Sequence, residues 1–458
     1  MVLPFECCTQ LEAMETTLST SDAAFVKRSS LNSKSNNSKR EGSRRAFRRL
    51  MKACWAHSHP NACTFRPIDN GLLHLLPDDV LFECLVRLPR ASLQNAMLVC
   101  QKWRSIVQAP DFYEHRHRIG VLEPLLFVFG GSGSVLSSAI YCTRIGKWLC
   151  ASLFSPQVVP GKEWLADHHN LDHAHSLLHT QPVVLNHRIF IVGAIPSHNS
   201  EIWGPDSTIM YDSWTKTLSR RAPMLLPRRK FACCSIGSRI LVAGGSNRCG
   251  LSRDALMEAE EYITEENVWK PLPNMPHRRY GCLGVAVGGI FYVIGGLKSS
   301  SVIGLCMQPY TYINSMDSFD SKTNTWQKTK PLRTGGCVIA CTVVDSCIYM
   351  LSSHAVELSF WKYDTQQDTW TRVRAPPIPS PLRLDNRLKF SCVSVDTSVY
   401  IIQVTGSIDD LLRRSGRHTR GLKEGLMLIY DTVKQEWSRA PDLPSNIKNG
   451  AACAVAYC

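Results

Sequence analysis

The stretch RILVAGG at residues 239–245 decides the fold, because the chain repeats it. It is a short apolar run that ends in paired glycines, which indicates a buried β-strand followed by a tight turn. The other copies, two of them degenerate, are LLFVFGG at 125–131, RIFIVGA at 188–194, IFYVIGG at 290–296, CIYMLSS at 347–353 and VYIIQVTG at 399–406. The six copies start 51–63 residues apart, and spacings of 44–70 residues over all the repeat landmarks predict a repeat architecture.

An aromatic residue follows each of these strands, and a tryptophan stands seven positions after it. The pairs are Tyr141/Trp148, Tyr262/Trp269, Phe319/Trp326, Tyr363/Trp370 and Tyr430/Trp437, whereas the second copy has Tyr211 with Leu218 and carries Trp214 between them. An aspartate follows the aromatic residue in four copies, at Asp212, Asp320, Asp364 and Asp431. We expect the aspartate to accept bonds from backbone N–H groups of a turn, and the tryptophan to pack from the next strand between adjacent sheets.

A four-stranded sheet from one copy cannot bury both of its faces. Six such sheets around an axis cover one another, so the repeat predicts a six-bladed β-propeller over residues 121–458. The first copy lacks the small-residue strand, such as FACCSIG, that precedes later copies, and GAACAVAYC at 450–458 supplies one. We therefore expect the C-terminal strand to complete the first blade. Degenerate glycines in the last two copies leave a count of five or seven blades open.

Residues 72–118 predict a small helical module. Pro77, Asp78 and Asp79 indicate a helix start, because proline needs no N–H partner there and the acids face the positive end of the helix dipole. Pro89 ends this helix, and Ser92 can cap a second one. The apolar stripes comprise Val80, Leu81, Cys84, Leu85 and Leu88, then Leu93, Ala96, Met97, Cys100, Trp103, Ile106 and Val107. A module of this size cannot bury all of them alone, so we expect a partner.

The net charge of +14 is unevenly distributed over the 458 residues. Residues 27–52 hold ten Lys and Arg against Glu41 alone, and residues 1–70 have too few apolar residues to order, so we expect a disordered Ser/Arg/Lys-rich tail. The tail resembles a nuclear localisation signal, with a merely solubilising role as the alternative. Early acids argue against a secretory signal, and no apolar run is long enough to cross a membrane. We expect the nucleus and/or the cytoplasm, with the 19 cysteines mostly reduced.

The run LPDDVLFECLVRLPRASLQNAMLVCQKWRSIV at 76–107 resembles the F-box family, and the Gly-Gly, Tyr-Asp and Trp repeats resemble kelch motifs. Their order resembles the plant F-box/kelch class. The resemblance implies a mainly β protein, a kelch propeller after a small all-α F-box. It also implies the substrate-recognition subunit of an SCF-type (Skp–cullin–F-box) ubiquitin ligase, without a catalytic site. The F-box would bind the Skp-type adaptor and, through it, cullin, while the propeller loops would bind a target protein for ubiquitination.

Carried over residue by residue, the resemblance assigns nine residues to the adaptor interface. They are Leu76, Pro77, Leu81, Leu85, Leu88, Pro89, Val99, Cys100 and Trp103. For each of them, packing inside the small module is the alternative.

Arginines that open several repeats are candidates for target binding. They are Arg228, Arg229, Arg278, Arg279, Arg333 and Arg383. If they converge on one face, their guanidinium groups suit an acidic or phosphorylated target. The alternative is that they brace neighbouring loops by bonding backbone carbonyls. The loops at 194–208, 297–317 and 407–425 differ most between copies and are further candidates for selectivity.

Two clusters have metal-ligating side chains. One is His168, His169, His173, His175 and His179 with Asp167 and Asp172, and the other is Cys54, His57, His59 and Cys63. His169 and His173 fit one helical face, so a metal site is conceivable in the first cluster, but it falls where an inserted loop between two blades is expected; the second cluster matches no common zinc-finger spacing. We therefore expect no metal and no cofactor. The rival functions are a kelch scaffold acting outside a ligase and a propeller enzyme, but no phosphate loop or nucleophile elbow occurs. We expect neither nucleic acid nor membrane as a partner.

Overall fold

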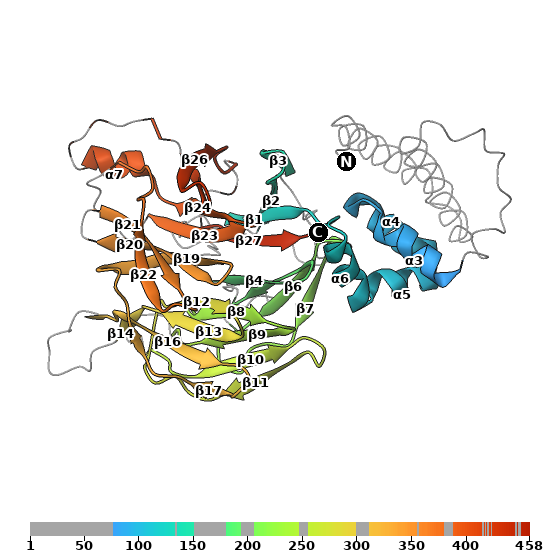
Figure 1. Ribbon diagram of the computed structural model, residues 1–458, viewed down its shortest axis with the longest axis horizontal. Helices are drawn as coiled ribbons and strands as arrows, with labels where there is room; N and C mark the ends of the chain where they lie inside the picture. Colours follow the sequence, from blue (N-terminus) through green and yellow to red (C-terminus); the bar gives the residue numbers. More distant parts are fainter. Residues whose placement is uncertain are drawn as a thin grey trace, which may run out of the picture. The chain divides into compact units, whose positions relative to one another are not determined.

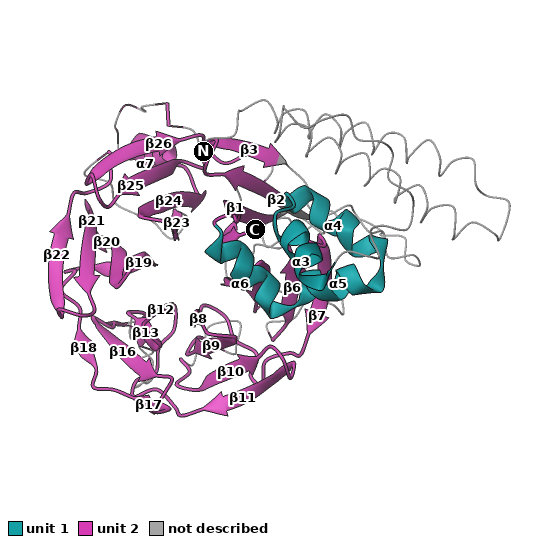
Figure 2. Ribbon diagram, turned by 45° about the vertical axis from the view of Figure 1, so that its right-hand side comes forward, with its two compact units in different colours: residues 1–119 teal, residues 120–458 magenta. Residues whose placement is uncertain are grey.

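The computed structural model describes residues 77–132, 135–150, 180–193, 206–246, 255–298, 311–354, 357–379, 388–414, 416, 418, 421–422, 424–444, 447 and 450–458. Internal contacts divide the chain into two compact units, residues 1–119 and 120–458. The described part of the first unit is helical, and the second is built almost entirely of strands (Figure 2). The basic tail predicted at 1–70 lies outside the described residues.

The described part of the first unit has four helices where the sequence predicted two. They are α3 (Asp78–Val86), α4 (Arg90–Val99), α5 (Gln101–Gln108) and α6 (Pro110–Arg118). Pro77 and Pro89 are the N-cap residues of α3 and α4, and both have extended backbone. Cys100 is extended as well, which splits the predicted second helix into α4 and α5. Pro77 therefore marks the start of the first helix as predicted. The second helix begins after Pro89 and not at Ser92, the predicted cap, which lies buried inside α4, and the break at Cys100 was not predicted.

The second unit consists of six blades around an axis (Figures 1 and 2). From the axis outward, blade 1 is β27 (Ala452–Tyr457), β1 (Pro124–Ser132), β2 (Val135–Cys142) and β3 (Lys147–Cys150). Blade 2 is β4 (Gln181–Leu185), β5 (Arg188–Val192), β6 (Thr208–Asp212) and β7 (Thr217–Arg221). Blade 3 is β8 (Ala232–Ile236), β9 (Arg239–Ala243), β10 (Ala259–Ile263) and β11 (Val268–Leu272).

The other three blades repeat this order. Blade 4 is β12 (Leu283–Val287), β13 (Ile290–Ile294), β16 (Ser315–Asp320) and β17 (Thr325–Trp326), with β18 (Lys330–Pro331) also paired to β16 and a side hairpin of β14 (Leu297–Lys298) and β15 (Thr311–Tyr312). Blade 5 is β19 (Cys337–Val344), β20 (Cys347–His354), β21 (Glu357–Asp364) and β22 (Thr369–Val373). Blade 6 is β23 (Lys389–Val395), β24 (Ser398–Thr405), β25 (Met427–Asp431) and β26 (Glu436–Ala440), with α7 (Ile408–Arg414) between β24 and β25. The predicted count of six blades is confirmed.

The C-terminal strand lies in the first blade. The antiparallel pairing of β27 with β1 sets Ala456 opposite Leu125 and Cys453 opposite Val128. Beyond the strands, Glu123 and Cys458 exchange two backbone hydrogen bonds of 3.0 Å. Blade 1 thus takes its innermost strand from one end of the unit and its other three from the opposite end, which closes the ring.

Each predicted aromatic–tryptophan pair is a directly opposed cross-strand pair. Tyr141 faces Trp148 and Tyr363 faces Trp370, and the other copies show the same register, with Leu218 facing Tyr211 in blade 2. The five ring pairs have centroids 4.7–5.2 Å apart. The aspartates also behave as predicted. The Oδ1 atom of Asp364, for example, accepts bonds from the backbone N–H groups of Gln366 and Gln367.

Four of these tryptophans also bond the preceding blade. Their indole Nε1–H groups donate to the backbone carbonyl of the residue that directly follows the outermost strand of that blade. The pairs are Trp148 to Pro441 (3.3 Å), Trp269 to Ala222 (2.9 Å), Trp326 to Pro273 (2.7 Å) and Trp437 to Arg374 (3.0 Å). The predicted packing between sheets therefore includes a repeated hydrogen bond across the seam.

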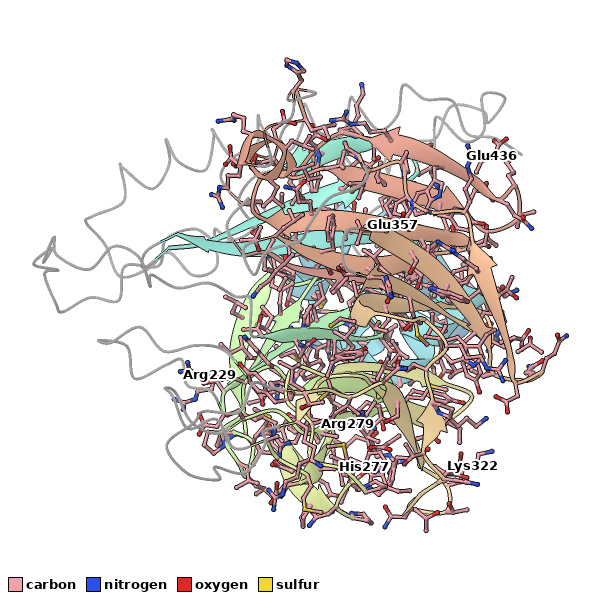
Figure 3. The ribbon with its side chains drawn as sticks, turned by 90° about the vertical axis from the view of Figure 1, so that its left-hand side faces the viewer. Arg229, His277, Arg279, Lys322, Glu357 and Glu436 are labelled. Carbon is pink, nitrogen blue, oxygen red and sulfur yellow. The ribbon has the colours of Figure 1, made fainter. Side chains whose placement is uncertain are left out.

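The two ends of the propeller differ in their connections. At one end, here called the turn face, the connections are short turns such as Gly237–Ser238 and 321–324. At the other end, here called the loop face, the inner strands start and the long connections leave, for example those spanning 222–231 and 406–426. Figure 3 shows Arg229 on one side of the unit, and Lys322 and Glu436 on the opposite side. Only the loop face therefore has room for sequence variation between the blades.

In the part of the chain that the structure describes, no helix is both long and apolar enough to cross a membrane.

Ring closure predicts a large effect of truncation. Removal of residues 450–458 takes away the only partner of β1 on its inner side, together with buried Cys453 and Ala454. We expect the melting temperature of the full chain to fall by on the order of 10 °C. A variant lacking residues 1–70 is the control, and we expect it to melt like the full chain. Equal melting of the C-terminal truncation and the full chain would refute closure by this strand.

Candidate functional site

The residues predicted to bind the adaptor divide into two groups. Leu81, Leu85, Leu88 and Trp103 are buried, with 1–7% of their surface exposed. Pro77 and Pro89 are exposed, Val99 and Cys100 are partly exposed, and Leu76 lies outside the described residues. The buried four thus correspond to the alternative, internal packing, and the accessible four remain candidates for contact.

Exposed apolar side chains extend the accessible group. Val80 is 41% exposed and lies one turn before Cys84, which is also exposed, while Leu98 near the end of α4 is 55% exposed. Lys102 at the start of α5 pairs with Asp78 at the start of α3. We name the accessible apolar residues of α3 and of the α4–α5 junction the adaptor patch; it comprises Pro77, Val80, Cys84, Leu98, Val99 and Cys100. Leu98 was missed because it lies off the stripe of apolar residues on its helix.

A buried arginine braces the helices below this patch. The Nη1 atom of Arg116 in α6 donates to the carbonyls of Val86 (2.6 Å) and Leu88 (2.7 Å), at the C-terminal end of α3. A cation there is favourable because the carbonyls carry the negative end of the helix dipole. Phe112 of α6 also meets Phe82 of α3 edge to face, with ring centroids 5.9 Å apart. The part of the patch on α3 is therefore presented by a helix that is braced against α6.

Two of the arginines predicted to bind a target are instead buried, which corrects that prediction. Arg228 and Arg279 expose none of their surface. The Nη1 atom of Arg228 donates to the carbonyls of Gly244 (2.9 Å) and Glu258 (3.0 Å), and its Nη2 atom pairs with Glu260. These arginines brace loops by bonding backbone carbonyls, which is the alternative to target binding given in the sequence analysis.

Arg279 repeats the arrangement one blade later. Its Nη1 atom donates to Gly295 (2.8 Å) and Ser315 (3.0 Å), and its Nε atom donates to Asp317 at 2.7 Å. Burial raises the pKa of Asp317, but the hydrogen bond and charge of Arg279 outweigh it and leave that pKa below its ordinary value. Both partners of this buried pair, Arg279 and Asp317, are therefore charged.

Each buried arginine has an acidic partner at the same place in the following blade. Glu260 and Asp317 each stand two positions before the aromatic residue of their blade. The other blades have Ala139, Ile209, Trp361 and Leu428 at this position. Arg333 precedes such a blade, blade 5, and is exposed. A search for an acid at this position in the following repeat would have identified the buried arginines.

The same loops explain the paired glycines. A Cβ atom on Gly244 would lie 2.7 Å from the carbonyl oxygen of Arg279, and one on Gly245 would lie 2.8 Å from that of Arg229. Both glycines have positive φ, at 70° and 93°. The connection between blades therefore crosses directly over the glycines and tolerates no side chain there.

The remaining predicted arginines lie nearer the surface. Arg229 is partly exposed and lies at the edge of the loop face in Figure 3. Arg278 is exposed and donates to the carbonyl of Ala255 at 3.1 Å. Arg383 lies outside the described residues. Of the predicted set, Arg229, Arg278 and Arg333 thus retain surface for a target.

The metal-site candidates at 167–179 and 54–63 also lie outside the described ranges. Within those ranges, no group of three or more His, Cys, Asp and Glu side chains is arranged to hold a metal ion.

Comparison with known proteins agrees with this architecture. Residues 73–115 match the F-box domain, and residues 227–276 and 278–333 match the kelch motif. The two kelch matches contain the two buried arginine–carboxylate pairs. The chain thus combines an F-box domain with a kelch propeller.

Similar curated proteins carry both names. The F-box/kelch-repeat protein At5g26960 of Arabidopsis thaliana is 38% identical over 392 residues, which is 83% of this chain and 89% of the relative. The F-box/kelch-repeat protein At1g67480 of the same plant is 27% identical over 268 residues, 57% of this chain and 63% of the relative. A third, At5g42350, is 24% identical over 400 residues, 81% of this chain and 64% of the relative. The chain belongs to the family of F-box/kelch-repeat proteins.

The buried ion pairs predict a stability difference between neighbouring arginines. Arg279→Ala leaves Asp317 buried without its partner, which costs about 3–5 kcal/mol of unfolding free energy. Arg278→Ala is the matched control, because the side chain is exposed and its loss costs about 0.5 kcal/mol or less. Urea unfolding of both variants measures the difference. Similar midpoints for the two variants would show that Arg279 is not a brace.

Proposed function

We propose that this chain is the substrate-recognition subunit of an SCF-type ubiquitin ligase. The observation that carries the proposal is the combination, in one chain, of an F-box domain with an exposed apolar patch and a closed kelch propeller with one loop-bearing face. F-box/kelch proteins act as adaptors, and neither matching family is catalytic.

In this proposal, the adaptor patch binds the Skp-type adaptor. Val80 and Leu98 supply exposed apolar surface, which gains free energy when a partner removes it from water. The buried Leu81, Leu85, Leu88 and Trp103 act indirectly, because they hold the helices that carry the patch. Cullin joins through the adaptor and needs no contact with this chain.

The loop face binds the target protein in this proposal. Strands and turns of the propeller are committed to the ring, while the connections at the loop face are free to vary. Arg229 and Arg278 favour an acidic or phosphorylated target, because each guanidinium can bond a carboxylate or a phosphate. Nuclear or cytoplasmic location, suggested by residues 27–52, also remains a proposal.

The adaptor contact has a direct test. We expect the Val80→Asp/Leu98→Asp double variant to lose capture of a purified Skp-type adaptor, because two charges would be buried in an apolar interface. Both positions are exposed, so the chain should still fold. The control is Val433→Asp, which places the same charge on a propeller side chain that is 72% exposed.

Binding assays with purified adaptor and circular dichroism of each variant separate the outcomes. A folded double variant that binds the adaptor as well as Val433→Asp does would contradict the assigned patch. Absence of adaptor binding by the unaltered chain would favour a kelch scaffold that acts outside a ligase.

A further inference from the structure

The ring of blades encloses a channel along its axis. The cavity has a volume of about 760 Å³ and is lined by the six inner strands and the residues that precede them. Small-molecule sites in proteins have volumes of roughly 300–1,000 Å³. The channel is therefore large enough for a ligand, and not merely a packing defect.

The charge along this channel has one sign only. Among the described lining residues, the charged side chains are Lys230 and Lys389, and no Asp or Glu is present. Neither lysine forms an ion pair with a described carboxylate. Both are partly buried, so their charges are only partly solvated. The channel thus has two ammonium groups and no described counter-charge.

These lysines occupy the same position in opposite blades. Lys230 precedes the last residue of β8 by six positions, and Lys389 precedes the last residue of β23 by six. The inner strands contact one another in the order β4, β8, β12, β19, β23, β27 and back to β4, so blades 3 and 6 stand opposite each other (Figure 2). Both lysines lie where the inner strands start, which is the loop-face mouth of the channel.

The backbone of Lys230 allows a variant that separates charge from fold. Its φ is 52°, in the left-handed region, which costs a residue with a Cβ atom roughly 1–2 kcal/mol. In the next blade the equivalent residue is Gly281, with a φ of 68°. Glycine would therefore satisfy the fold at this position. Its ammonium lies 5.2 Å from the ring centroid of Tyr280, another lining residue.

The two ammonium groups also interact electrostatically. Burial, and then the charge of Lys230, lower the pKa of Lys389. Like charges that face one cavity repel, and an anion between them removes the repulsion. Gln181 and Ser353, also in the lining, have polar groups for further hydrogen bonds.

We propose that the loop-face mouth of the channel is an anion-binding site in which Lys230 and Lys389 together hold a carboxylate or phosphate group. The anion is either a free small molecule or an acidic side chain of the target. Only the second source rests on the proposed ligase function; the site itself does not.

The test uses the purified full chain and two probes, inorganic pyrophosphate and a hexaglutamate peptide. We expect at least one of them to bind in calorimetric titrations and to raise the melting temperature more than sodium chloride does at equal ionic strength. Lys389→Met, which keeps the apolar stem, should weaken binding about tenfold to a hundredfold, because one charged hydrogen-bond donor is lost. Binding of pyrophosphate alone identifies a free small anion as the ligand, and tighter binding of hexaglutamate identifies a protein side chain.

Lys230→Gly is the sharpest variant, with a matched control on the turn face. It should melt at the same temperature as the unaltered chain or higher, because the strain at φ 52° is relieved, yet bind the probe about tenfold or more weakly. Lys216→Gly removes the same charge and relieves a φ of 56° in a turn between β6 and β7, far from the channel mouth along the blade. We expect Lys216→Gly to bind the probe like the unaltered chain.

Two results would overturn the proposal. One is that neither probe has an effect beyond that of sodium chloride. The other is that Lys230→Gly and Lys389→Met bind the probe as tightly as Lys216→Gly. Loss of adaptor capture has no bearing on either result, so failure of the ligase proposal and failure of the anion site can be told apart.

Discussion

The hydrogen bond from a tryptophan indole to the preceding blade is the interaction on which the propeller depends. A blade presents two wide sheet faces. Its only covalent link to each neighbouring blade is a single chain connection. The indole covers apolar surface and its N–H satisfies the carbonyl that directly follows the neighbouring outer strand, for example Pro273. The cross-strand aromatic residue, such as Phe319 opposite Trp326, holds the indole in place. One spacing of seven residues thus sets the cross-strand register in five blades and, in four of them, also places the hydrogen bond across the seam.

The seam between blades 1 and 2 shows what replaces this interaction. Leu218 stands in the tryptophan position of blade 2 and cannot donate. Instead, Phe127 and Phe129 of blade 1 lie against Tyr211, with centroids 6.0 and 6.2 Å apart. Trp214, displaced into the turn, stacks on His187 at 3.8 Å. Aromatic packing from β1 therefore replaces the indole bond where the C-terminal strand closes the ring.

Much of the fold could be predicted from the sequence, because its determinants are local. A strand ending in glycines, the Tyr/Trp spacing and the turn aspartates each lie within one repeat. Arg228 and Arg279 were misjudged because their carboxylate partners, Glu260 and Asp317, lie more than thirty residues onward in the following blade. The convergence of Lys230 and Lys389 was equally invisible, since opposite blades meet only when the ring is complete. The break of the second predicted helix at Cys100 depends on packing within the module, which periodicity does not report.

The ring has its long connections on one face only, and we propose that this face recognises the target. Photo-crosslinking tests it most directly, with the crosslinking amino acid placed at Arg229 on the loop face or at Lys322 on the turn face, on opposite sides of the propeller in Figure 3. The measurement is the mass-spectrometric detection of crosslinked protein in cells at each position. We expect a specific partner crosslinked from position 229 and none from position 322. A partner crosslinked only from position 322 would contradict the proposal.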